Sequence, residues 1–101
     1  MFVKYENPPA AKRAANLSRL IELSKTVELN PDWSLVIGEA SVRFVKKDRT
    51  RTLKIDSCNV FTLDVGLTNV KSNTFSCKTA DEAWKMTHQT LKAFTGIRST
   101  Q

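Results

Sequence analysis

Six basic side chains near the middle of the sequence are the residues best placed to do chemistry. All of them lie between positions 43 and 54, and the wider stretch 34–54 contains only two acidic residues, Glu39 and Asp48. This stretch therefore carries +4 of the chain's formal net charge of +6. Guanidinium and ammonium groups bind phosphate oxygens, so the cluster favours the binding of a polyanion. The six residues are Arg43, Lys46, Lys47, Arg49, Arg51 and Lys54.

Two segments of alternating apolar and polar residues position this cluster. Residues 40–46 and 51–55 show the period of two that is typical of strands with one buried face, and the polar residues 47–50 are expected to join them as a four-residue loop. In the hairpin that this pattern predicts, the apolar pairs share the inner face. Arg43 then lies directly opposite Lys54 on the outer face. Like charges in that position repel each other, and a bound anion would relieve the repulsion.

Several interpretations of the basic hairpin are open. Exposed strands often carry Lys and Arg for solubility and to prevent edge pairing, and Asp64 is expected diagonal to Lys54, where it neutralises part of the charge. Alternatively, the hairpin binds the phosphates of DNA or RNA, or an acidic protein surface. The expected N-terminal helix adds a second basic group, which would assist only if it faced the same way. That group is Lys12, Arg13 and Arg19.

A helix is expected near each end of the chain. In residues 8–28 the apolar positions recur three or four apart, and Asn7 is suited to cap the first free amides. The second helix, residues 79–95, opens with the capping box Thr79-Ala80-Asp81-Glu82, in which Glu82 should bind back to the Thr79 amide. Gly96 is placed to take the left-handed conformation that ends a helix.

The remaining pattern completes one antiparallel sheet. Residues 61–65 alternate like the hairpin strands and predict a third central strand, while residues 34–37 and 74–77 are candidate edge strands. The sequence contains no internal repeat, low-complexity segment or flexible linker. We therefore expect a single small α+β domain over residues 1–101: an N-terminal helix, an antiparallel meander of three to five strands and a C-terminal helix, with the helices packed on one face of the sheet.

The aromatic residues favour a packed core over a stacking surface. Single-strand binding normally uses exposed aromatic rings, but five of the rings fall on the expected inner face of a strand or helix. These are Phe44, Phe61, Phe75, Trp84 and Phe94. Tyr5 and Trp33 are the remaining candidates for stacking. The nucleic-acid hypothesis therefore predicts contacts to the phosphate backbone with little reading of base sequence.

No catalytic or metal-binding constellation is apparent. The sole histidine, His88, lies in the second helix between Trp84 and Lys92, and neither neighbour would orient an imidazole for catalysis. Cys58 and Cys77 form no CxxC pair, and the three glycines form no phosphate-cradling loop. We therefore expect no enzymatic activity, no cofactor and no bound metal.

The sequence shows no feature of export or membrane insertion. Its first residues lack the apolar core of a signal peptide, and no stretch approaches the roughly 18 apolar residues of a membrane span. We expect a cytoplasmic protein without membrane contact, in which both cysteines are reduced.

These observations lead to two functional hypotheses. The first is a small non-enzymatic nucleic-acid-binding protein that contacts phosphates through the basic hairpin, assisted by the charges of the first helix. The alternative is a protein–protein interaction module, an inhibitor or regulatory subunit, that docks through the sheet edge or the first helix and includes Trp33 or Val45 in an exposed apolar patch. The alternative includes self-association as a homodimer.

Overall fold

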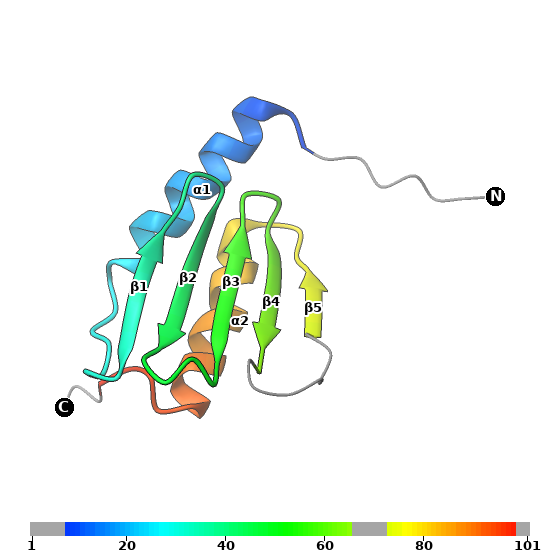
Figure 1. The fold of residues 1–101 in the computed structure, drawn as a ribbon. Helices are drawn as coiled ribbons and strands as arrows, with labels where there is room; N and C mark the ends of the chain where they lie inside the picture. Colours follow the sequence, from blue (N-terminus) through cyan, green and yellow to red (C-terminus); the bar gives the residue numbers. More distant parts are fainter. Residues whose placement is uncertain (1–7, 66–72, 99–101) are drawn as a thin grey trace.

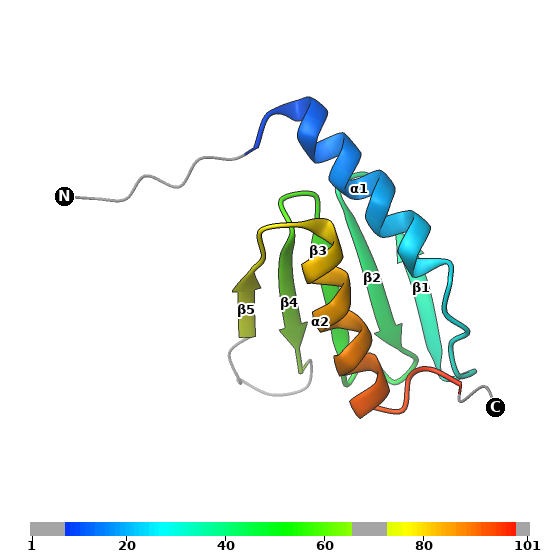
Figure 2. The ribbon, with the colours of Figure 1, turned by 180° about the vertical axis from the view of Figure 1, so that it is seen from behind.

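The computed structural model describes residues 8–65 and 73–98. Its strands form one antiparallel sheet in chain order, and both helices lie on the same face of that sheet (Figures 1 and 2). This arrangement confirms the expected α+β fold, including both edge strands. The elements are α1 (Ala10–Ser24), β1 (Trp33–Ile37), β2 (Ser41–Lys46), β3 (Thr52–Asp56), β4 (Val60–Asp64), β5 (Asn73–Ser76) and α2 (Ala80–Ala93).

The hairpin of β2 and β3 has the register that its alternation predicts. Phe44 pairs with Leu53, and Arg43 pairs with Lys54. At the turn the Lys46 amide donates to the Arg51 carbonyl over 3.1 Å, which closes the predicted four-residue loop. A shift by one residue would move the apolar side chains to the opposite face, so burial excludes that register, and the length of the loop excludes shifts by two residues.

The core lies between the sheet and the two helices. The inner apolar side chains of β2 and β3 are fully buried, and the helices add Leu20 from α1 and Ala83 and Leu91 from α2. Trp33 is also part of this core and is only 4% exposed. The expectation that Trp33 offers a stacking or docking surface is therefore wrong, because β1 begins at this residue and turns its ring toward the helices.

Phe75 shows the reverse of Trp33, because the sequence predicts that it is buried and the structure leaves it exposed. It has the inward phase of β5 and its ring centroid lies 6.4 Å from that of Phe61, yet it is 49% exposed. The reason is its position on an edge strand, because α2 packs mainly over β3 and β4. The predicted burial of Phe75 is therefore wrong, whereas Phe44 and Phe61 are buried and Trp84 and Phe94 pack against the core.

The first helix is shorter than predicted. It begins at Ala10, where the Pro9 carbonyl accepts from the Arg13 amide over 2.9 Å, and no described side chain caps this end. The proposed cap, Asn7, lies outside the described residues. The helix ends at Ser24, well before residue 28, because the amide and hydroxyl of Thr26 both bond to the Leu23 carbonyl and start a turn.

The second helix begins at the predicted capping box, but the residue that ends it in the left-handed conformation is not the predicted one. The Thr79 hydroxyl accepts from the Glu82 amide over 3.1 Å, as expected. The Glu82 carboxylate accepts from the Lys78 amide over 3.1 Å rather than from Thr79. After the helix, the left-handed conformation falls on Thr95, with φ of 55°, and not on Gly96.

Candidate nucleic-acid interface

The helices leave one side of the sheet uncovered, and we call this side the open face (Figures 1 and 2). The strand pairings place one outward residue from each strand in a row across its middle. Arg43 and Lys54 occupy the centre of this row, and both are exposed. The row consists of Val36, Arg43, Lys54, Thr62 and Thr74.

Beside Arg43 the surface is hollowed, with a volume of about 460 Å³. We call this depression the basic hollow. It is bounded by β1, β2, the start of β3 and the loop between β2 and β3, and no carboxylate lines it. Its lining combines four basic residues (Arg43, Lys46, Lys47 and Arg49), two hydroxyl residues (Ser34 and Thr52) and two apolar residues (Val36 and Val45).

The tip of the hairpin is held by one carboxylate. Asp48 accepts from the Thr50 hydroxyl at 2.6 Å and from the Thr50 amide at 3.0 Å, and these bonds lower the pKa of its carboxyl. The Lys46 amine lies 3.8 Å from the same carboxylate and is therefore partly neutralised. Arg49 takes the left-handed turn conformation, with φ of 61°.

Four exposed basic residues of the hairpin have no ionic partner among the described residues. Within the described part of the chain, no carboxylate lies within 4.0 Å of the charged groups of Arg43, Lys47, Arg49 or Lys54. All four side chains are exposed. Asp64 lies opposite Thr52 and hence diagonal to Lys54, as expected, and moderates the charge on that side. Among the described residues, the open face thus carries positive charge that its carboxylates neutralise only in part.

Arg51 does not join this group. It shares the inward phase of Leu53, and its guanidinium lies over the ring of Phe94, 4.5 Å from the ring centroid. Its Nε is buried and has no hydrogen-bond partner among the described residues. Arg51 therefore packs between the sheet and the end of α2 on the side opposite the open face. Its inclusion in the predicted phosphate-binding set is not supported by its position.

The basic residues of α1 are also separated from the open face. Because α1 lies on the other side of the sheet, Lys12, Arg13 and Arg19 do not extend the hairpin cluster (Figure 2). Arg19 is paired with Glu22 at 2.7 Å and with Asp81 at 2.9 Å, and the bond to Asp81 is the main cause of its raised pKa. Arg19 thus links the two helices.

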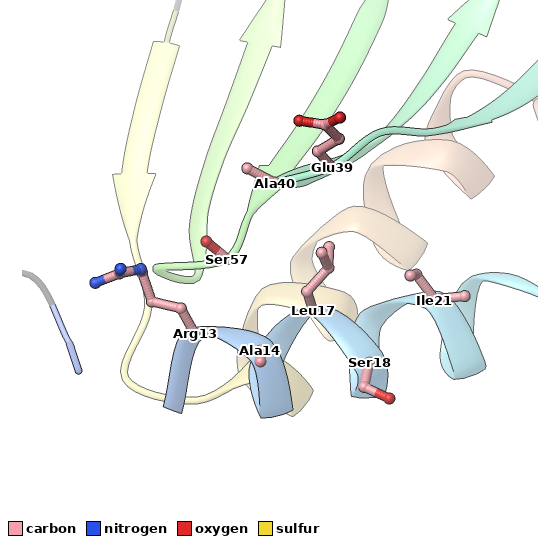
Figure 3. Close-up of a pocket in the computed structure, with 8 residues that line it drawn as sticks. All are labelled: Arg13, Ala14, Leu17, Ser18, Ile21, Glu39, Ala40 and Ser57. Atoms are coloured by element: carbon pink, nitrogen blue, oxygen red, sulfur yellow. The ribbon is translucent and has the colours of Figure 1, made fainter. Parts of the chain in front are cut away.

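Arg13 donates to the Pro8 carbonyl and lines a second hollow of about 410 Å³ between α1 and two turns of the sheet. Figure 3 shows Leu17 pointing into this hollow from the helix, with Glu39 across from it and the Arg13 guanidinium at its edge. These turns lie at the end of the sheet away from the β2–β3 loop (Figure 1). The mixed charges and the distance from the hairpin separate this hollow from the candidate interface.

The reactive side chains form no site of their own. The His88 ring packs beside that of Trp84, with the centroids 5.8 Å apart, and burial raises the pKa of the Cys77 thiol. Over residues 8–65 and 73–98, no three residues of the types His, Cys, Asp and Glu converge on a point that a metal ion could occupy. No helix in these same ranges has the length and apolar character that crossing a membrane requires.

The hollow also contains residues that the sequence analysis did not single out. Ser34 and Thr52 add hydroxyl groups, and Val36 adds an apolar wall, beside the predicted basic residues. The alternation of the sequence places these three residues on the same side of the sheet as Arg43, so their position in the hollow could have been predicted. The prediction would have been weak, because isolated Ser, Thr and Val residues are common on exposed strands.

None of the protein-family models, curated proteins or solved structures compared with this chain matches it. Inference about its function therefore rests on the geometry and charge of the open face.

Proposed function

We propose that this protein binds nucleic acid through the phosphate backbone, with the open face and the tip of the β2–β3 hairpin as the binding surface. The observation that carries the proposal is the pairing of Arg43 with Lys54 at the centre of an uncovered sheet. Lys47 and Arg49 lie beside them around the basic hollow, and no carboxylate lines it. A row of phosphates offsets the repulsion between these cations.

The mechanism is release of the counterions that surround the nucleic acid. Four cations that each neutralise a phosphate give a slope of about −3.6 in log affinity against log salt on a duplex, so affinity falls roughly 100-fold between 50 and 200 mM salt. The open-face side chains of the described strands include no aromatic ring. Contacts to phosphate and sugar, with little reading of bases, are therefore expected.

The experiment is fluorescence anisotropy with labelled single- and double-stranded DNA and RNA at 50 and 200 mM salt. The test variant is Arg43→Gln/Lys54→Gln, and the control is Lys12→Gln/Lys85→Gln. The control removes the same charge from exposed positions on the helices. We expect the test variant to flatten the salt slope by about 2 and the control to leave it unchanged. Equal slopes for the wild-type protein and the test variant would exclude the open face.

The edge of β1 supports a second candidate function, binding of a protein partner by strand addition. Val36 is 37% exposed and Ile37 is 43% exposed, and β1 contains no charged residue to discourage pairing. Its test is sedimentation of the wild-type protein and of the Ile37→Lys variant, each over a range of concentrations. Association that depends weakly on salt and is lost in Ile37→Lys would support this function, and a concentration-independent monomer would exclude self-association through β1.

A further inference from the structure

The basic hollow has the composition of a site for a small phosphorylated group. Its volume of about 460 Å³ lies within the range of roughly 300 to 1,000 Å³ that is usual for small-molecule sites. Arg43, Lys47 and Arg49 supply charge, and the Ser34 and Thr52 hydroxyls supply further hydrogen bonds. Every one of these polar groups can donate to a phosphate oxygen.

The charge around the hollow exceeds what one internal phosphate of a nucleic-acid strand can neutralise. An internal phosphodiester carries a single negative charge, whereas a phosphomonoester carries about −1.5 to −2 at neutral pH and has three strong acceptor oxygens. Arg43, Lys47 and Arg49 have no ionic partner among the described residues. Three cations around one depression therefore fit a monoester better than a diester.

The apolar part of the lining gives the group attached to this phosphate a place to lie. Val36 and Val45 belong to neighbouring strands and line the same hollow as the cations. An aliphatic surface of this kind packs against a ribose or base without selecting among bases. From there the open face continues to Lys54, which pairs with Arg43 on the next strand.

We propose that the basic hollow binds the terminal phosphate of a nucleic-acid strand, with the terminal nucleoside against Val36 and Val45 and the following phosphates near Lys54. This inference rests on the proposed function, because the strand beyond its first nucleotide uses the same open face. It adds a preference for phosphorylated ends that general backbone binding does not require. A 5′-phosphate and a 3′-phosphate share this chemistry, and the experiment separates them.

The test compares three single-stranded oligonucleotides of one sequence, each labelled at an internal position. One carries a 5′-phosphate, one a 3′-phosphate and one neither, and binding to the full chain is followed by anisotropy at about 100 mM salt. We expect one phosphorylated form to bind about tenfold more tightly than the unphosphorylated form. The Lys47→Gln/Arg49→Gln variant should remove this preference. Lys54→Gln should weaken binding to all three oligonucleotides by a similar factor and preserve the preference.

The outcomes separate this inference from the function on which it rests. If all three oligonucleotides bind with equal affinity, the open face binds backbone as proposed and the terminal-phosphate site is overturned. If none binds, the terminal-phosphate site and backbone binding of single strands both fail, and the proposed function fails as well if the labelled duplexes of the first experiment do not bind either. A preference that survives Lys47→Gln/Arg49→Gln would also overturn the assignment to the hollow. The substituted residues are all exposed, and circular dichroism of each variant verifies that the fold is retained.

Discussion

Arg43 and Lys54 lie directly opposite each other on β2 and β3, with both side chains exposed on the open face. Cross-strand pairs of this kind change stability by about 0.2–1 kcal/mol, and like charges do so unfavourably. No carboxylate of the described chain forms an ion pair with either residue. The repulsion between these two side chains therefore has two opposite effects. It destabilises the folded protein without ligand, and it favours the complex with phosphate.

Replacement of Lys54 by Glu should change stability and nucleic-acid affinity in opposite directions. Lys54→Glu converts the repulsion into attraction across the strands, so we expect the free energy of unfolding to rise by about 0.3–1 kcal/mol at low salt. The same change places a negative charge in the phosphate path, so affinity for nucleic acid should fall at least tenfold. Urea denaturation measures the first effect, and anisotropy measures the second.

Salt provides the control for the stability effect of Lys54→Glu. At about 1 M salt the Debye length is near 3 Å, so interactions between exposed charges are strongly screened. The gain in stability should therefore shrink at high salt if it is electrostatic. A variant that is less stable than the wild-type protein at low salt would show that the repulsion does not operate in the folded state.

The same substitution at Arg49 and at Arg51 should affect two different properties, nucleic-acid binding at Arg49 and stability at Arg51. Arg51→Gln removes the contact with Phe94 and should lower the free energy of unfolding by about 0.5–1 kcal/mol while leaving binding nearly unchanged. Arg49→Gln, at the exposed tip, should weaken binding and change stability by less than about 0.5 kcal/mol. Each variant removes one positive charge, so each is the control for the other. An equal loss of binding in both would place Arg51 in the binding surface.

The register of the basic hairpin was predictable from sequence because loop length and burial together constrain it. A four-residue loop over 47–50 brings Phe44 opposite Leu53, and this pairing keeps the apolar residues on one face. The position of Arg43 opposite Lys54 follows from that pairing. The start of α2 was predictable for a similarly local reason, since the Thr79 hydroxyl bonds to an amide only three residues away.

The features that sequence reasoning missed depend on tertiary packing. The alternation gives Arg51 the phase of Leu53, but only the position of Phe94 at the end of α2 explains how a guanidinium is accommodated there. The exposure of Phe75 depends on how far α2 extends across the sheet. The separation of Arg13 from the hairpin depends on which face α1 covers. No local pattern encodes these three relationships.

Gly96 should not tolerate a side chain. A Cβ at this position would lie 3.0 Å from Leu91 Cδ2 and 3.0 Å from the Trp33 ring atom Cε2, both in the core. We expect Gly96→Ala to lower the free energy of unfolding by about 1–3 kcal/mol, as overpacking usually does. Urea denaturation followed by tryptophan fluorescence measures this change, with Trp33 and Trp84 as the fluorescent side chains.

Gly38→Ala is the matched control for Gly96→Ala. A Cβ at Gly38 meets the Ser41 carbonyl oxygen at 3.4 Å, an ordinary contact, and this glycine does not have a positive φ. Alanine at such a position reduces the freedom of the unfolded chain and stabilises by about 0.4–1 kcal/mol. A loss of stability in Gly38→Ala as large as that in Gly96→Ala would mean that contact with Trp33 is not the cause.

Asp48 should make the hairpin sensitive to acid. Its hydrogen bonds with Thr50 lower the pKa of the carboxyl below the ordinary value of 3.8. Since the folded pKa is the lower one, the stabilisation is fully present above pH 3.8 and is lost as the pH falls through the folded pKa. The stability difference between the wild-type protein and Asp48→Asn should therefore be constant near pH 6 and vary only in the acid range.

Urea midpoints measured from pH 2 to 6 test this dependence, and a difference that does not vary with pH would contradict it. Asn can still accept from the Thr50 amide, so Asp48→Asn preserves the turn and removes its charge. The substitution also frees the Lys46 amine from the carboxylate that lies 3.8 Å away. With one fewer negative charge beside the basic hollow, nucleic acid should bind more tightly at neutral pH. Weaker binding of Asp48→Asn would show that the tip does not contact phosphate.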